Sequence, residues 1–190
     1  LLFATLYIVF AKFLRFWATI PHYPQYLLPG ILLWNYFTEV TVGSVGSIVS
    51  KGELIRKINF PKYTIILAGS FSAFINLLLN FVVLAVFMLI GHVAIGWNAL
   101  LLIPLIIELF MLSISLAFFL SSLFVKFRDV QYIWEVIVQA AFYATPILYA
   151  LSIVPHNIAK ILILNPMAQI IQDSRWALIT PDTQTINQVY

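Results

Sequence analysis

Two long apolar runs constrain this chain more than any other feature. Residues 64–90 carry no charged side chain, and residues 99–125 carry only Glu108. A helix needs about 20 mostly apolar residues to cross the hydrocarbon core of a bilayer, so both runs predict membrane spans. The composition agrees, since 63% of the 190 residues are hydrophobic, 9% are charged, and the mean hydropathy is +1.02.

Less uniform apolar runs at residues 1–11, 27–50 and 130–151 are also predicted to span the membrane. The runs are continuous and lack the alternation of barrel strands, which indicates helices. The expected fold is therefore an all-α integral membrane protein, a polytopic bundle with five spans. The chain begins inside an apolar run without Met and shows no signal peptide, so residues 1–190 are expected to be one transmembrane domain truncated at both ends. The absence of cysteine excludes disulfides and cysteine-based metal sites.

The basic residues predict the orientation of the bundle. The net charge is +3 and the pI is about 9.2, but the cations sit at the ends of apolar runs, which fits membrane topology better than nucleic-acid binding. Residues 51–62 and 126–129 are assigned to the cytosol, and the three histidines then fall in outer loops. The cytosolic side receives Lys51, Arg56, Lys57, Lys62, Lys126 and Arg128, against Lys12, Arg15, Lys160 and Arg175 on the outer side.

Residues 152–176 do not read as an ordinary span, because prolines and polar residues interrupt them. Asn165 and Pro166 should end one short helix and start the next, since the residue before proline leaves the helical region and proline fits a first turn. We expect two half-helices that enter from the outer side and form an outer gate containing Pro155, Asn165 and Pro166. The alternative is an interfacial loop with a surface helix.

Polar and aromatic residues inside the spans are candidates for function. Glu39, Glu108 and Glu135 are costly at membrane depth, so they should face the bundle interior or be neutral. They should bond between helices or line a polar conduit, together with Asn35, Asn76, Asn80 and Gln139. Among the aromatic residues, Trp34, Tyr36 and Tyr143 are predicted to line a conduit, although packing and lipid contact are the alternative roles. Gly43, Ser44, Gly46 and Ser47 offer small surfaces for helix contact.

Three motifs in order give the chain a family resemblance. They are Leu-Ile-Arg-Lys-Ile-Asn-Phe-Pro at residues 54–61, Phe-Arg-Asp at 127–129, and Thr-Pro-Ile-Leu-Tyr at 145–149 followed by Asn-Pro-Met at 165–167 and Arg175-Trp176. The series resembles the permease subunits of ABC type-2 transporters that export polysaccharides such as O-antigen, teichoic acid or capsule precursors. The resemblance covers nearly the whole chain. It implies a sixth span beyond the C-terminus and a location in the bacterial inner membrane.

The resemblance also implies partners. Two copies would form a homodimer, and each would dock an ATP-binding cassette subunit that binds ATP and Mg, with no cofactor in this chain. Residues 51–62 would be the coupling loop. Leu54 and Ile58 share a helical face beside charged residues, which suits a docking element. The alternative is a basic anchor on membrane lipids. The coupling residues would be Glu53, Leu54, Ile55, Arg56, Lys57 and Ile58.

Arg128 and Asp129 are expected at the cytosolic entrance, with Arg128 near phosphate and Asp129 capping the following helix. The chain lacks the Gly-rich phosphate loop of ATPases and is not expected to be an enzyme. The substrate would be a lipid-linked glycan. The alternatives are a multidrug or lipid exporter of the same class, and an ion-coupled carrier that would use the acids. A membrane enzyme is less favoured because no nucleophile and base, or clustered acids, share a depth.

Overall fold

The computed structural model describes residues 23–50, 61–91, 96–149, 151 and 154–179 of the chain. Every regular element in these ranges is a helix, which confirms the all-α prediction for this part of the protein. One of the predicted spans, at residues 1–11, lies outside these ranges. The number of spans therefore stays a prediction.

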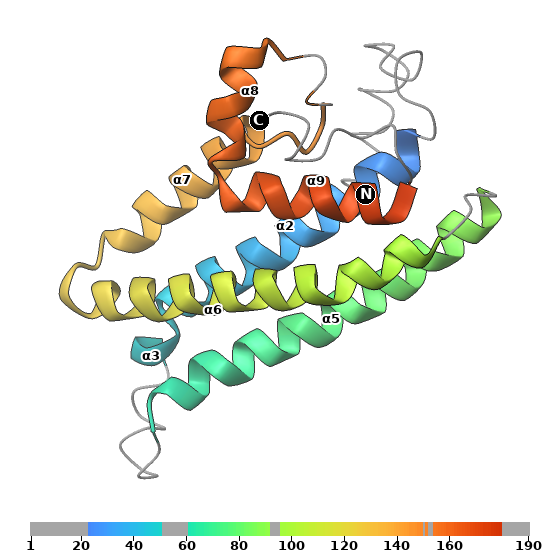
Figure 1. The fold of residues 1–190 in the computed structure, drawn as a ribbon. Helices are drawn as coiled ribbons and strands as arrows, with labels where there is room; N and C mark the ends of the chain where they lie inside the picture. The colour runs from blue at the N-terminus through green and yellow to red at the C-terminus, as the bar shows by residue number, and fades with distance from the viewer. Residues whose placement is uncertain (1–22, 51–60, 92–95, 150, 152–153, 180–190) are drawn as a thin grey trace.

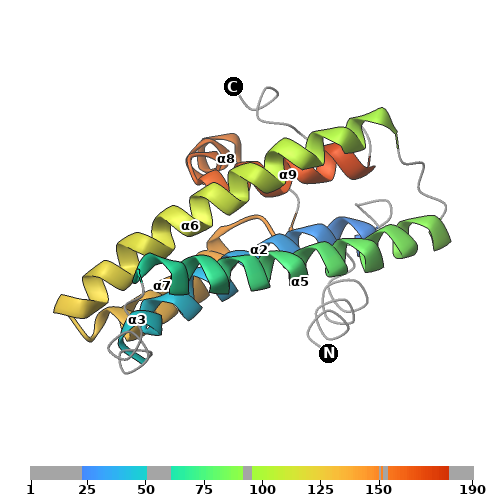
Figure 2. The same ribbon diagram turned by 90° about the horizontal axis from the view of Figure 1, so that it is seen from below.

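The two apolar runs form the two longest helices. Helix α5 (Tyr63–Ile90) has 28 residues, and the 3-10 helix η3 (Trp97–Leu101) leads directly into helix α6 (Leu102–Lys126). Both are long and apolar enough to cross a membrane. Helix α5 starts after Pro61 and stops at Gly91, while α6 stops at a basic residue, Lys126, which suits the negative end of a helix dipole. The two helices run beside each other in both views (Figure 1, Figure 2).

Helix α2 (Tyr23–Val45) is the centre of the bundle, and the short helix α3 (Ser47–Ser50) follows it. It packs against α5, α6, α7 and α9 (Figure 1). The main core forms where these helices meet, around Leu27, Leu33, Leu109 and Ile171, all fully buried. Pro29 lies inside α2, where it cannot donate the backbone hydrogen bond that the carbonyl of Gln25 would accept.

Helix α7 (Val130–Ala144) is shorter than predicted. The sequence predicted one span over residues 130–151, but the helix ends at Ala144, and Thr145 takes an extended conformation before Pro146. At 1.5 Å per residue, 15 residues give a helix about 22 Å long, which falls short of the hydrocarbon core. The residue before proline is driven out of the helical region, and this explains the early end.

Two short helices complete the described chain. Helix α8 (His156–Ile163) and helix α9 (Pro166–Ile179) meet at Asn165 and Pro166, as predicted. Helix α9 packs on α2, α6 and η3, and nine of its residues are buried. In contrast, α8 packs on α9 and stands at the edge of the molecule (Figure 1).

Candidate functional site

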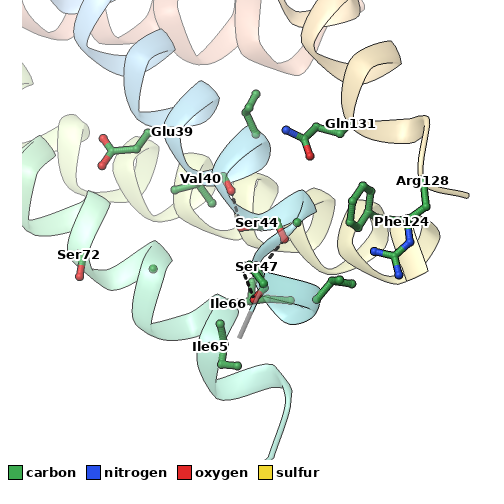
Figure 3. Close-up of a pocket in the computed structure, with 16 residues that line it drawn as sticks. Glu39, Val40, Ser44, Ser47, Ile65, Ile66, Ser72, Phe124, Arg128 and Gln131 are labelled. Carbon is green, nitrogen blue, oxygen red and sulfur yellow. Dashed lines mark hydrogen bonds between the residues drawn. The ribbon is translucent and has the colours of Figure 1, made fainter. Parts of the chain in front are cut away.

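A pocket of about 840 Å³ opens between α2, α3, α5 and the turn from α6 to α7. Its lining is mostly small or polar, which is unusual on a surface where α5 and α6 expose large apolar side chains. Figure 3 shows Glu39 and Ser72 at one end of the pocket, and Arg128 and Gln131 at the other. The polar and small lining residues are Glu39, Gly43, Ser44, Gly46, Ser47, Ser50, Gly69, Ser72, Arg128 and Gln131.

The small residues of α2 keep the pocket open. The sequence predicted that Gly43, Ser44, Gly46 and Ser47 would serve close helix contact. A Cβ added at Gly43 would meet nothing within 4 Å, and one added at Gly46 would lie 3.5 Å from the Gln131 side chain. The hydroxyl of Ser47 donates to the carbonyl of Ser44 at 2.8 Å, so it bonds within its own helix region. These residues therefore border a cavity rather than a tight helix contact.

Arg128 is the cation that lines this pocket within the described ranges. It is exposed, and its guanidinium lies over the ring of Phe124 at 5.2 Å from the centroid. Stacking on a ring restricts the side chain while leaving its donors accessible, which suits the bidentate binding of a phosphate. Asp129 is the N-cap residue of α7, as predicted, but its side chain makes no capping hydrogen bond. Its backbone carbonyl instead accepts from Ile133 at 3.1 Å.

A polar strip continues from the pocket along the bundle. The amide of Asn76 donates to Glu39 at 3.4 Å and joins α5 to α2, while the amide of Gln131 donates to Glu135 at 3.1 Å within α7. Glu39 and Glu108 are exposed and Glu135 is half-buried, so none of the three is buried inside this chain. The predicted alternative, that these carboxyl groups are neutral, stays a prediction. Asn35 and Gln139 are exposed too. The prediction of hydrogen bonding between helices is confirmed for Glu39.

The aromatic residues predicted to line a conduit lie in different environments. Trp34 and Tyr36 are buried in the core, where Trp34 contacts Phe37 and Phe142, and Tyr36 contacts Phe74. Trp34 borders an apolar pocket of about 200 Å³ that it shares with Trp134 and Asn165. Tyr143 is 71% exposed and stays a candidate for lining. Burial removes Trp34 and Tyr36 from the surface that a substrate would touch in this conformation.

This difference predicts opposite effects for two alanine substitutions. Trp34→Ala should destabilise the protein by about 3 to 5 kcal/mol, because it removes a large buried side chain and leaves a cavity. Tyr143→Ala, at an exposed position, should change the stability by less than about 0.5 kcal/mol. Thermal unfolding in detergent measures both effects. Equal melting temperatures for the two variants would contradict the placement of Trp34 in the core.

Asn165 ties the two half-helices to the end of α7. Its amide donates to the hydroxyl of Thr145 at 3.1 Å, and its carbonyl oxygen accepts from the backbone of Met167 at 3.0 Å, as a helix cap does. Pro166 is the first residue of α9, and Pro155 immediately precedes α8. The residues predicted for the outer gate thus shape the ends of both short helices.

Arg175 is the important residue whose environment was not predicted from the sequence. Predicted as a charge on the outer side, it is instead fully buried in α9. Its guanidinium lies 3.8 Å from the centroid of the Tyr26 ring, and Nε donates to the backbone carbonyl of Tyr26 at 3.0 Å. The terminal nitrogens donate to the Tyr26 hydroxyl at 2.8 Å, to the Pro146 carbonyl at 2.7 Å and to the Ile147 carbonyl at 2.5 Å. We call Arg175, Tyr26, Pro146 and Ile147 the Arg175 clamp.

Gly30 makes room for this clamp. A Cβ added at Gly30 would lie 2.7 Å from a terminal nitrogen of Arg175. The guanidinium cannot easily move away from this Cβ, because it is held by its hydrogen bonds. We therefore expect Gly30→Ala to destabilise the protein by about 1 to 3 kcal/mol through overpacking. Gly43→Ala and Gly69→Ala are matched controls on helices with nothing within 4 Å, and should be neutral or slightly stabilising. The melting temperatures of the three variants measure this, and three equal values would contradict the close approach.

The predicted coupling segment lies outside the described residues. It comprises Glu53, Leu54, Ile55, Arg56, Lys57 and Ile58. The structure does show where the segment is anchored, because α3 ends at Ser50 and α5 begins at Tyr63. Ser50 lines the 840 Å³ pocket, and so does Ile65, near the start of α5. No group of three or more potential metal ligands occurs in the ranges that the structure describes.

Comparison with known proteins agrees with the motifs. Residues 1–179 match the model of a family described as ABC-2 type transporter. The chain is 30% identical over 175 residues to the O-antigen export system permease protein RfbA of Klebsiella pneumoniae, covering 90% of this chain and 66% of that protein. It is 29% identical over 157 residues to the protein of the same name from Myxococcus xanthus, covering 80% of this chain and 59% of that protein. The chain thus spans less than two thirds of the length of these relatives.

Proposed function

This chain belongs to the ABC-2 type transporter family, and we propose that it is the permease subunit of an ATP-driven exporter of lipid-linked polysaccharide. The relatives named above are O-antigen export permeases, which supports a polyglycan of the O-antigen, teichoic acid or capsule type as the substrate. The protein is located in the bacterial inner membrane, which the chain crosses several times. The chain itself is a transport component, and ATP hydrolysis takes place on a separate subunit.

The observation that carries this proposal is the pocket of about 840 Å³ with Arg128 at its edge. A lipid-linked glycan presents a phosphate next to a polar sugar chain. Arg128 supplies a cation for the phosphate, and the serines, Glu39 and Gln131 supply hydrogen-bond partners for sugar hydroxyls. The polar side chains in the lining of this cavity can bind the head group. Lipid tails, which are apolar, do not compete for these hydrogen-bonding groups.

The coupling of transport to ATP follows from the position of residues 51–62. The segment joins α3 to α5 in the sequence, and both of these helices contribute residues to the lining of the pocket. A nucleotide-binding partner that pushes on this segment would move α2 and α5, the two helices bridged by the Glu39–Asn76 hydrogen bond. Movement of either helix changes the width of the pocket. A second copy of the chain would complete the conduit opposite the polar strip.

Two further functions use the same architecture. A drug or lipid exporter of this family would need an apolar substrate path, and the apolar pocket of about 200 Å³ beside Trp34 is the feature that favours it. An ion-coupled carrier would need acids gathered at one site. Glu39 and Glu135 are instead each bonded to an amide, on different helices. The polar pocket is the larger feature, so the glycan exporter is preferred.

Deletion of the gene in its host tests the proposal. We expect the surface polysaccharide to disappear and its lipid-linked form to accumulate on the cytosolic side, with both effects reversed by the wild-type gene. Susceptibility to hydrophobic drugs, measured in the same strains, should not change. Unaltered surface glycan with raised drug susceptibility would replace this proposal with the drug exporter.

A further inference from the structure

The Arg175 clamp joins three parts of the chain that are far apart in sequence. Arg175 is on α9, Tyr26 is in the first turn of α2, and Pro146 and Ile147 follow α7. Four hydrogen bonds and a stacked ring hold the guanidinium at full burial. A buried cation is costly, and here several oxygens with partial negative charge surround it.

The surrounding sequence is shaped to receive this one side chain. Pro29 interrupts the regular hydrogen bonding of α2 in the turn that presents the Tyr26 carbonyl. Gly30, next to it, leaves space that a Cβ would fill. Pro146 leaves its own carbonyl in an irregular turn where a side chain can reach it. The planar fork of arginine can bond α2 and the turn together, whereas the single ammonium of lysine cannot span both.

We propose that Arg175 is the positioning residue of the outer gate, and that it keeps α9, the start of α2 and the turn after α7 together as one unit throughout transport. Separation at this point would leave a cation and three backbone carbonyls unpaired away from water, which is a large cost. The inference rests on the proposed transport function for its outer gate and its export readout, while the packing of the three segments on Arg175 stands apart from it.

A weaker contact lies nearby, at α8. The buried cluster beneath this helix has three members, Leu151, Ala159 and Ile163. Its other side exposes Ile158, Ile161 and Leu164, the last at 72% exposure. On this proposal the clamp does not open, and α8, which has the smaller buried contact, is the part of the outer gate that moves.

Thiol labelling tests the clamp without reference to transport. Residues 1–190 contain no cysteine, and any cysteine elsewhere in the full-length protein is first replaced by serine. Ile147 is fully buried, so an Ile147→Cys variant should react slowly with a membrane-impermeant maleimide in oriented vesicles. Adding Arg175→Ala or Arg175→Lys should speed this reaction at least tenfold. Leu164→Cys, which is exposed, should react equally fast in all backgrounds and serves as the control. Equal rates at position 147 with and without Arg175 would overturn the proposal.

A disulfide that replaces the clamp tests whether the unit stays together. An ideal Cβ at Gly30 lies 3.4 Å from the Cγ2 methyl of Ile147, so side chains at these two positions are in contact, as a disulfide between them requires. We expect Arg175→Ala to abolish glycan export, and Gly30→Cys with Ile147→Cys in that background to restore at least half of it when oxidised. Reduction should remove the rescue.

The matched control pairs Ile147→Cys with Gly43→Cys in the Arg175→Ala background, where no disulfide is expected to form and export should stay absent. An oxidised, membrane-inserted protein that remains inactive would show that the unit must separate, and would overturn the proposal. If Arg175→Ala is degraded, the labelling and disulfide experiments are done with Arg175→Lys.

If the wild type exports no glycan, the proposed function is wrong. The labelling rates and the melting temperature of the oxidised protein would still test the clamp.

Discussion

Replacing Leu54 and Ile55 with glutamate should weaken capture of the ATP-binding subunit on the order of 100-fold, as two central apolar contacts worth about 1 to 2 kcal/mol each are lost. The two side chains belong to the segment between α3 and α5, where an apolar surface flanked by Arg56 and Lys57 is predicted. Glutamates there would also bring two charges into a contact that excludes water. Co-purification of the full-length protein with its ATP-binding subunit in detergent measures the effect.

A matched control keeps the apolar contact and alters the charge. Arg56→Gln with Lys57→Gln should leave the captured amount within a few-fold of wild type, and should mainly change the rate of association and its dependence on salt. If both double variants capture the partner normally, residues 51–62 do not couple the subunits. The alternative role, a basic anchor on membrane lipids, would then predict that the glutamine pair has the larger effect on membrane insertion.

The long helices were predictable because each is determined by its own residues. An uncharged run longer than the bilayer core is a helix whatever surrounds it, and α5 and α6 follow the predicted runs within a few residues. The break at Asn165 and Pro166 was predictable for the same reason, since proline restricts its neighbour locally. The same rule applied at Thr145 and Pro146 would have shortened the predicted span at residues 130–151.

The side-chain environments were harder to predict. In helices that are apolar all round, periodicity does not say which face meets another helix, so the buried Trp34 and the exposed Tyr143 looked equivalent. Arg175 was misplaced because its partners lie 149 and 28 or 29 residues away in sequence. A usable signal was present, however. A buried arginine needs oxygen partners, and the motif with Pro146 supplies backbone carbonyls that no helix uses. The polar neighbours of Arg175, such as Asp173 and Ser174, made the burial itself hard to foresee.

Arg128→Glu should reduce glycan export at least tenfold, since it puts a negative charge where the proposed substrate phosphate enters. A bidentate contact from arginine to phosphate is among the stronger hydrogen-bonded pairs, and the substitution changes attraction into repulsion. Arg128 is exposed, so the variant should fold and bind its ATP-binding partner as the wild type does. Export is measured as surface polysaccharide, together with the lipid-linked form that accumulates inside.

Lys126→Glu is the matched control for this prediction. Lys126 lies two residues away and makes the same kind of ring contact, over Phe127 at 5.3 Å, but it does not line the pocket. Both substitutions change the charge of the turn between α6 and α7 equally, so any effect on membrane orientation should be shared. Loss of export in the Arg128 variant alone would assign the effect to the pocket. Equal loss of export in both variants would assign the effect to membrane topology and would remove Arg128 from the proposed entrance. Normal export in both variants would exclude a phosphate contact at this turn.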